Sequence, residues 1–346
     1  MRRANHLWHR VHSFEALRTA TLRAARGKRR SRATLAFLDR WEPECLRLGR
    51  ALESGSWRPS RTKTFEIHDP KRRRITAVTF RDRVVHHALL APLQPVFERR
   101  MIYDSYACRA GKGTHSAIRR AQVFLRRHRF SLRMDVRAFF DSLQPSIVLS
   151  TIEHSVKDRR VLELCERILE VRTIGLPIGS LTSQWFANLT LDRLDHLVKE
   201  RLRIPGYLRY MDDFVLFADS KGQLRDAHAS VRNYLDTELS LTLKASATRL
   251  APVSEGLPFL GFSIFRGTIR LRPATKRRFR WRLRWLRREL SRGHIDLDHY
   301  ERALAAMIAH VRHADTRGLT RSWFHDRRDP QDQDLPDHPL TPNRDL

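Results

Sequence analysis

The chain has 346 residues, enough for two or three packed subdomains, and 41% of them are apolar, enough for a buried core. Its 67 Lys and Arg outnumber 38 Asp and Glu, and the net charge of +29 indicates a polyanionic partner, most commonly nucleic acid. No apolar run of about 18 residues and no signal peptide occur, which argues against a membrane or secreted protein and predicts a cytoplasmic one.

Three cysteines, Cys45, Cys108 and Cys165, are scattered along the sequence. No Cys-x-x-Cys occurs, so the sequence supports neither a zinc ribbon nor a disulfide framework. We expect all three to be small buried residues.

The first 130 residues are expected to be helical apart from one hairpin. Residues 1–60 predict basic helices with a loop at 27–31. Alternating segments at 62–67 and 74–80 predict two strands around a turn at Asp69-Pro70. A helix follows over 84–96.

From residue 131 onward, strands and helices mix, which predicts an α+β fold. A hydroxyl near Thr182 can cap the start of a helix. The expected elements are a strand at 131–136, helices at 146–172, 182–201 and 222–239, a loop at 175–179, and strands around 259–262.

Two amphipathic helices are predicted near the C-terminus, over 276–292 and 299–313. Nine Lys or Arg residues crowd the polar faces of the first, and they repel one another unless a polyanion neutralises them. From His325 the Pro/Asp-rich chain is expected to be disordered. The apolar stripe of the first helix consists of Phe279, Leu283, Leu286 and Leu290.

Two adjacent carboxylates, Asp212 and Asp213, lie between apolar, strand-forming segments. An isolated Asp-Asp pair is more often a solvated turn, but here like charges between buried strands raise each other's pKa unless a cation lies between them. Asp135 ends another predicted strand. Phosphoryl transfer uses two Mg²⁺ ions about 4 Å apart, and Mg²⁺ prefers oxygen ligands. We therefore expect Asp135 and Asp212 to bridge the metals, with Asp213 and the carbonyl of Val136 as supporting ligands.

The segment Met134 to Asp141 resembles the first palm motif of reverse transcriptases, and Tyr210-Met211-Asp212-Asp213 resembles the third. The resemblance covers about residues 60–325. It implies an RNA-directed DNA polymerase that uses dNTPs, a template RNA, a cDNA or primer strand, and two Mg²⁺ per active site, with Mn²⁺ as an alternative.

The same resemblance implies a right-hand polymerase fold with fingers, an antiparallel-sheet palm and a short helical thumb. The expected domains are N-terminal helices and fingers at 1–130, a palm at 131–265 with fingers insertions at about 146–180, a thumb at 266–324 and a disordered tail at 325–346.

The segment Leu176 to Gln184 narrows the family, because group II intron and retroviral enzymes have Pro-Gln-Gly where this chain has Pro177-Ile178-Gly179. It resembles the reverse transcriptases of diversity-generating retroelements, which miscopy adenines of a template RNA so that mutated cDNA replaces part of a target gene. This implies a bacterial or phage-encoded enzyme with a small basic pentameric accessory protein.

A group II intron-like, retron or phage-defence enzyme is the alternative. A catalytically silent RNA-binding module is a third reading, against which the retained acids argue.

The family motifs also assign residues around the incoming nucleotide. Phe140 matches an aromatic steric gate that excludes a ribose 2′-hydroxyl, whereas Phe139 is expected in the core. Ile178 replaces a Gln that helps orient the nucleotide. A misaligned base pair should therefore lose less binding free energy than usual relative to a correct pair. Gln184 is assigned to nucleotide binding as well.

Basic residues are expected to hold phosphates. Arg74 matches the fingers residue that covers the triphosphate, and Arg72 and Arg73 are expected at the template strand. The thumb residues expected to contact nucleic acid are Lys276, Arg277, Arg280 and Arg284.

Phe259-Leu260-Gly261 resembles the primer grip, whose Gly lets the backbone approach the primer terminus. The sequence departs from the family pattern just before it, where Ser246-Ala247 stands in place of a lysine that protonates pyrophosphate. Lys244 is the candidate replacement.

Overall fold

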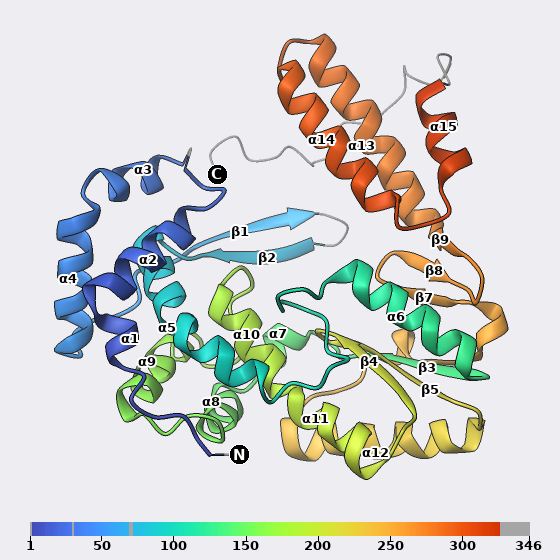
Figure 1. Cartoon of the computed structure of the whole chain (residues 1–346), viewed down its shortest axis with the longest axis horizontal. Helices are drawn as coiled ribbons and strands as arrows, with labels where there is room; N and C mark the ends of the chain where they lie inside the picture. The colour runs from blue at the N-terminus through green and yellow to red at the C-terminus, as the bar shows by residue number, and fades with distance from the viewer. Residues whose placement is uncertain (1, 30, 69–71, 326–346) are drawn as a thin grey trace.

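The computed structural model describes residues 2–29, 31–68 and 72–325. Helices near the N-terminus pack around α5 (Phe80–Glu98) on one side of the molecule (Figure 1). Serine hydroxyls explain where two of them begin, because Ser13 and Ser31 accept hydrogen bonds from backbone N–H groups of the first turn. These N-terminal helices are α1 (His9–His12), α2 (Phe14–Ala25), α3 (Arg32–Asp39) and α4 (Trp41–Glu53).

A two-stranded hairpin, β1 (Lys63–His68) and β2 (Arg72–Ala77), extends from these helices toward the centre of the molecule (Figure 1). The second strand starts two residues earlier than expected and ends at Ala77. It cannot reach Phe80, because the Thr79 side chain accepts from the N–H of Asp82 and starts α5 there. The expected turn at Asp69-Pro70 lies outside the described residues.

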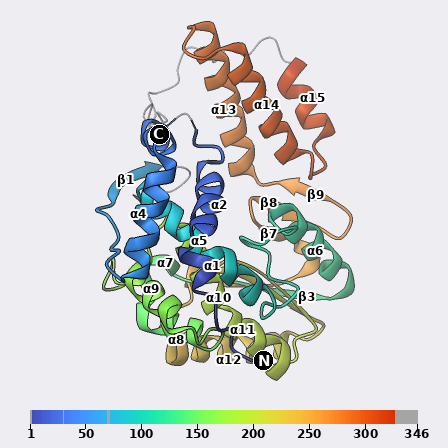
Figure 2. The ribbon, with the colours of Figure 1, turned by 60° about the vertical axis from the view of Figure 1, so that its left-hand side comes forward.

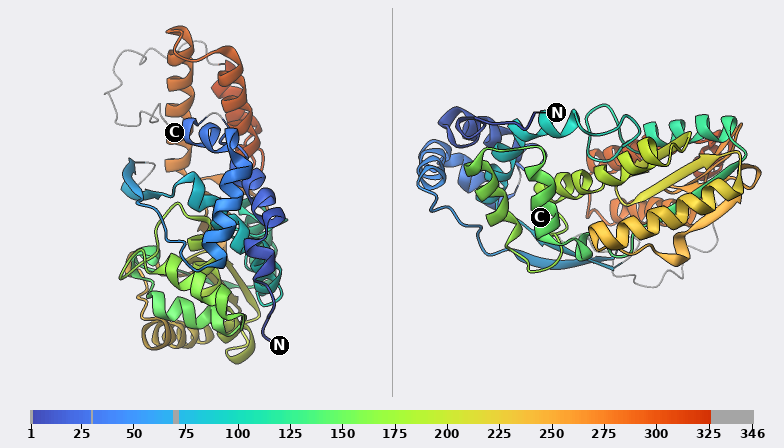
Figure 3. Two further views of the ribbon diagram at one scale, coloured as in Figure 1. Left: turned by 90° about the vertical axis from the view of Figure 1, so that its left-hand side faces the viewer. Right: turned by 90° about the horizontal axis from the view of Figure 1, so that it is seen from below.

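A four-stranded antiparallel sheet in the order β4-β5-β3-β6 forms the centre of the second half. Helices α6 and α12 cover its two faces (Figure 3, right). Every residue of β5 is buried, which explains the continuous apolar run from Phe214 to Ala218 after its first residue, Asp213. The elements are α6 (Thr114–Arg127), β3 (Phe130–Asp135), β4 (Gly206–Tyr210), β5 (Asp213–Ala218), α12 (Lys221–Leu239), the 3₁₀ turns Ala245–Ala247 and Val253–Glu255, and β6 (Arg249–Pro252).

A helical layer connects β3 to β4. The residues expected to be helical over 146–172 form two helices, because the buried Asp158 carboxylate accepts from the N–H groups of Leu7, Trp8 and Val161 and starts a new helix. The helix expected over 182–201 begins one residue earlier, at Leu181, and is divided into α10, α11 and a π-helical segment that ends at Arg201. The layer consists of α7 (Phe139–Ser142), α8 (Pro145–Glu153), α9 (Arg159–Leu169), α10 (Leu181–Thr190), α11 (Asp192–His196) and the π-helix Leu197–Arg201.

The C-terminal part is a helical bundle that rises from a small three-stranded sheet (Figure 2). Leu283 and Leu286 of the predicted apolar stripe are buried. A third helix, α15, was not expected, and its Trp323 packs 6.1 Å from the ring of Phe279. The elements are β7 (Leu257–Phe259), β8 (Phe262–Ile264), β9 (Ile269–Leu271), α13 (Pro273–Ser291), α14 (Leu297–Val311) and α15 (Arg317–His325).

Some sequence-based expectations fall outside this picture or are wrong. The tail from residue 326 lies outside the described residues. Cys45 and Cys165 are buried as expected, but Cys108 is exposed and lies in a turn with φ 58°. Among the described helices, none has the length and apolar character needed to cross a membrane.

Candidate active site

The tight turn between β4 and β5 carries Asp212 and Asp213. Tyr210 pairs with Asp213 across the hairpin, and Met211 takes the left-handed conformation, φ 58°, that closes the turn. β3 pairs with β5 so that Asp135 lies directly opposite Asp213, a Cα separation of about 5 Å in an antiparallel sheet. The N–H of Val136 donates to the Asp212 carbonyl at 3.3 Å. The pairing register therefore brings Asp135 to the turn.

The carboxylates of Asp135 and Asp212 are close enough for the negative charge of one to affect the other. Burial and the negative charge of Asp135 raise the pKa of Asp212 to about 6. Among the described residues, no side chain donates a hydrogen bond to the carboxylate of Asp135 or Asp212. An oxygen-rich, negatively charged pair of this kind fits a hard divalent cation such as Mg²⁺.

The third aspartate has a different environment from the one expected. Arg133 donates from Nε to Oδ1 of Asp213 at 2.8 Å and from Nη2 to Oδ2 at 2.7 Å. Burial raises the pKa of Asp213, and Arg133 opposes that effect. In the part of the chain that the structure describes, no three His, Cys, Asp or Glu side chains gather as a metal site. In place of the expected cluster of three carboxylates, the structure has two, those of Asp135 and Asp212, and an ion pair between Asp213 and Arg133. Arg133 reaches Asp213 because it precedes Asp135 by two residues and so lies on the same face of the strand.

The arginines of β2 divide between the two faces of the β1–β2 hairpin. Arg74 pairs across the strands with Glu66, and the Arg72 guanidinium binds the same carboxylate at 2.7 and 2.9 Å. Alternation places Arg73 on the opposite face, where its positive charge lowers the pKa of Asp212. Arg73, one residue before the Arg74 expected at the triphosphate, is therefore a neighbour whose charge reaches the acidic turn.

The loop before α10 joins the hairpin to the helical layer. The N–H of Thr76 in β2 donates to the carbonyl of Ile178 at 2.9 Å. The N–H of Leu176 donates to the carbonyl of Phe140 at 2.6 Å. Only glycine fits at Gly175, where φ is 83° and a Cβ would lie 2.9 Å from Asp141 backbone atoms. The half-buried Ile178 thus lies in a loop that bonds to the β1–β2 hairpin at Thr76 and, through Leu176, to the half-buried Phe140.

The remaining expected site residues lie on two further elements. Phe139 is buried, as expected of a core residue. Gln184 is half-buried on α10, where its Oε1 lies 3.6 Å from the thiol of Cys108. The N–H of Lys244 donates to the Asp135 carbonyl at 2.8 Å, so the backbone of this lysine runs beside the acidic turn.

The segment that resembles the primer grip is a two-residue turn between β7 and β8. Phe259 is buried, and Leu260 and Gly261 both have positive φ, 47° and 86°. The Gly261 carbonyl accepts from the Thr275 hydroxyl at 2.9 Å, which fixes the turn to the start of α13. On that helix the expected nucleic-acid contacts are exposed at Arg277 and Arg280 and half-buried at Lys276 and Arg284.

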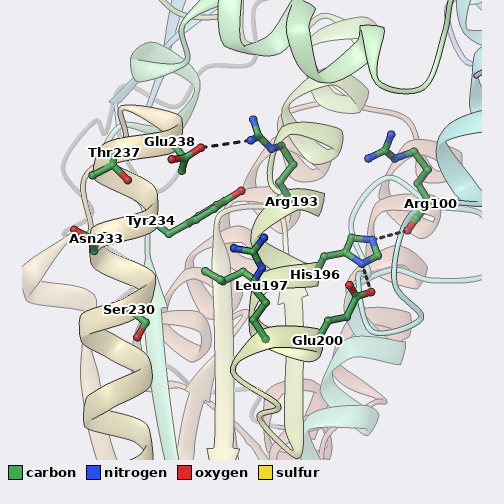
Figure 4. Close-up of a pocket in the computed structure, with 11 residues that line it drawn as sticks. Arg100, Arg193, His196, Leu197, Glu200, Ser230, Asn233, Tyr234, Thr237 and Glu238 are labelled. Atoms are coloured by element: carbon green, nitrogen blue, oxygen red, sulfur yellow. Dashed lines mark hydrogen bonds and ion pairs between the residues drawn. The ribbon is translucent and has the colours of Figure 1, made fainter. Parts of the chain in front are cut away.

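A separate polar cavity of about 640 Å³ lies between α12 and the α11–π-helix segment (Figure 4). Its walls include Arg100 and His196, whose Nε and Nε2 atoms lie 3.8 and 3.6 Å from a carboxylate oxygen of the buried Asp192. Neither oxygen of Asp192 accepts a hydrogen bond from a described residue. Burial and the neighbouring Asp195 raise the pKa of Asp192 to about 7.

Replacing Asp192 with asparagine will stabilise the protein at pH 8. Because the folded state holds the Asp192 proton more tightly than the unfolded chain, the stability from this group is present below about pH 4 and lost as pH rises through about 7. Thermal melting should show a gain of several degrees at pH 8 that shrinks at pH 5. Asp195→Asn is the control: this carboxylate is fully hydrogen-bonded, so its loss should destabilise. Equal melting of wild type and Asp192→Asn at pH 8 would contradict the prediction.

Comparison with known protein families gives one match over more than half of the chain. A family model described as reverse transcriptase (RNA-dependent DNA polymerase) matches residues 66–264. Protein YkfC of Escherichia coli is 24% identical over 264 residues, which covers 62% of this chain and 69% of YkfC.

Two intron proteins are also similar over shorter stretches. Nuclear intron maturase 1 of Arabidopsis thaliana is 35% identical over 91 residues, 26% of this chain and 13% of the maturase. Group II intron-encoded protein LtrA of Lactococcus lactis is 21% identical over 170 residues, 45% of this chain and 28% of LtrA. The chain therefore spans less than a third of either protein. Among solved structures, apo telomerase from Candida tropicalis has a TM-score of 0.47 at 12% identity, covering 63% of this chain and 49% of that one.

Proposed function

The chain belongs to the reverse transcriptase family, and on that premise we propose that it copies a template RNA into adenine-mutagenised cDNA for a diversity-generating retroelement. The observation that carries polymerisation is the meeting of Asp135 with the Asp212 turn, set by the pairing of β3 with β5. The observation that supports copying errors is the position of Ile178. Its loop is bonded to Thr76 and, through Leu176, to Phe140.

Each part of the site has a role in this proposal. Asp135 and Asp212 would hold Mg²⁺, which when bound activates a 3′-hydroxyl and stabilises the triphosphate and its leaving group. Arg73, above the turn, would bind the triphosphate through charge-assisted hydrogen bonds. Phe140 would exclude the 2′-hydroxyl of a ribonucleotide by contact. Exposed arginines of α13 would follow the phosphates of the template–cDNA duplex.

Ile178 supports the mutagenic part of the proposal. A branched apolar side chain cannot donate or accept a hydrogen bond with the incoming nucleotide. A correctly paired nucleotide then gains no polar contact that a mispaired one lacks, and discrimination between them falls. We further propose that a small basic pentameric accessory protein and a dedicated template RNA act with the enzyme.

Replacing Ile178 with glutamine will lower misincorporation opposite template adenine by about fivefold, the equivalent of one hydrogen bond of about 1 kcal/mol. The measurement is deep sequencing of cDNA made on a defined RNA, with and without candidate accessory protein. Ile174→Gln is the matched control, because this isoleucine lies in the same loop but is 54% exposed. An error spectrum at adenine that is the same for wild type and Ile178→Gln would rule out the role of Ile178.

A second candidate is a group II intron-type enzyme that copies accurately. It is favoured by the similarity to Nuclear intron maturase 1 and LtrA. The same sequencing experiment separates the two: uniform, low error at all four template bases from the wild-type protein supports the intron-type enzyme, whereas errors concentrated at adenine support the retroelement enzyme.

A further inference from the structure

Arg209 precedes the catalytic turn by one residue and is completely buried, with 0% of its side chain exposed. All the donors of its guanidinium are used. Nε and Nη2 bind the two oxygens of Asp195 at 2.7 and 2.6 Å. Nη1 donates to Oδ1 of Asn188 at 2.6 Å and to the carbonyl of Met211 at 3.1 Å, and Nη2 also donates to the carbonyl of Asn188 at 3.2 Å.

A buried guanidinium of this kind is an expensive way to stabilise a core. Removing two charges from water costs several kcal/mol per ion, and well-packed apolar residues in their place are often as stable or more so. A complete set of hydrogen bonds instead fixes one geometry. The backbone of Arg209 is fixed as well, because its N–H donates to the Asp104 carbonyl and its own carbonyl accepts from Tyr106, both at 2.9 Å.

The bond to Met211 is the one that reaches the catalytic turn. Met211 is held with φ 58°, a conformation that costs a non-glycine residue free energy and persists only where the surroundings impose it. A fixed Met211 carbonyl fixes the peptide plane that leads into Asp212. Through Asn188 the same guanidinium holds α10, the helix that follows the Ile178 loop.

We propose that Arg209 is a positioning residue of the polymerase: it holds the Met211 carbonyl, and through it the direction of the Asp212 carboxylate, in fixed relation to α10. The inference rests on the proposed role of Asp212 in polymerisation. Arg209 would act only through Met211 and Asp212, without touching the substrate or the reacting atoms.

The test compares Arg209→Lys with Tyr207→Phe. A lysine keeps the charge but cannot reach Asp195, Asn188 and Met211 together. Tyr207→Phe removes the hydroxyl that donates to Asp195 at 2.6 Å, in the same buried network but without contact to the turn. The readouts are kcat per titrated active site, KM for dNTP, melting temperature, and hydrogen exchange of the peptide 206–218.

For Arg209→Lys we expect kcat per active site to fall by about 10²-fold, the cost of a small misplacement of a catalytic group, with KM for dNTP within about twofold and faster exchange at 206–218. Tyr207→Phe should lower the melting temperature by a few degrees and leave kcat unchanged. Equal kcat losses in the two variants, or wild-type kcat in Arg209→Lys, would overturn the proposal.

If Arg209→Lys does not fold, Asp195→Asn provides the test. It keeps the shape of the network and weakens the anchor of the guanidinium, so kcat should fall several-fold with unchanged KM. An unchanged kcat in Asp195→Asn would overturn the proposal in that case. Absence of primer extension by the wild type would instead reject the proposed function, while the exchange data would still report on the turn.

Discussion

Replacing Asp212 with asparagine will reduce primer extension on an RNA template by about 10³-fold or more without weakening RNA binding. The Asp212 carboxylate lies beside Asp135, and its pKa is raised by burial and by that neighbouring charge. Asparagine preserves the shape but removes a charge that would hold a divalent cation, and electrostatic stabilisation of phosphoryl transfer contributes several kcal/mol. Steady-state incorporation of a labelled dNTP measures the loss, and filter binding of the template measures affinity.

Two further variants sharpen this test. Asp219→Asn removes the same charge just beyond the other end of β5, where the side chain is 60% exposed, and should leave extension within about twofold. Asp213→Asn leaves Arg133 without its partner, so it should lower the melting temperature but reduce kcat less than Asp212→Asn does. Wild-type kcat in Asp212→Asn would exclude its role as a metal ligand, and equal losses at both positions would exclude the division of roles between them.

The family and the fold class could be predicted from the sequence because the motifs lie on strongly patterned strands. The family match over residues 66–264 confirms the reverse transcriptase assignment, and the antiparallel sheet around the YMDD turn agrees with the right-hand polymerase fold. Because apolar, strand-forming residues lie on both sides of Asp212 and Asp213, the sequence predicts a buried hairpin with the two acids at its turn. The retroelement assignment stays a prediction, because it depends on a single loop.

The partners of the acids were harder to predict than the acids themselves. The alternation of β3 would have placed Arg133 on the face of Asp135, but nothing in the sequence shows that its guanidinium reaches Asp213 instead of solvent. Arg209 follows the same rule: burial of its whole side chain depends on Asp195, which comes from a different element.

The ends of helices and the burial of some of their residues were not predicted where tertiary contacts, and not the local sequence pattern, determine them. The local signal that separates α8 from α9 is the N-cap Asp158, and its carboxylate is held there by tertiary bonds from the N–H groups of Leu7 and Trp8. In the N-terminal helices, Leu35 and Leu46 are about half exposed, whereas Phe37 is buried.

Alanine at Arg73 will lower kcat/KM for dNTPs by about 10- to 100-fold, whereas alanine at Arg74 will leave it within about threefold. The expected loss corresponds to one or two charged hydrogen bonds of about 1.5–3 kcal/mol in total. Arg73 lies on the face of the hairpin that carries Ile75, whose side chain is next to Gly179 in the Ile178 loop. Arg74 lies opposite Glu66 on the other face. Pre-steady-state incorporation of a single dNTP measures both variants.

The pair of variants is informative because the two arginines are adjacent and both exposed. Loss of general positive charge would weaken template binding equally in both, and this is measured separately by RNA affinity at several salt concentrations. Only contact with the triphosphate makes the dNTP dependence of Arg73→Ala differ from that of Arg74→Ala. A larger loss in Arg74→Ala than in Arg73→Ala would contradict the prediction and assign the triphosphate contact to Arg74.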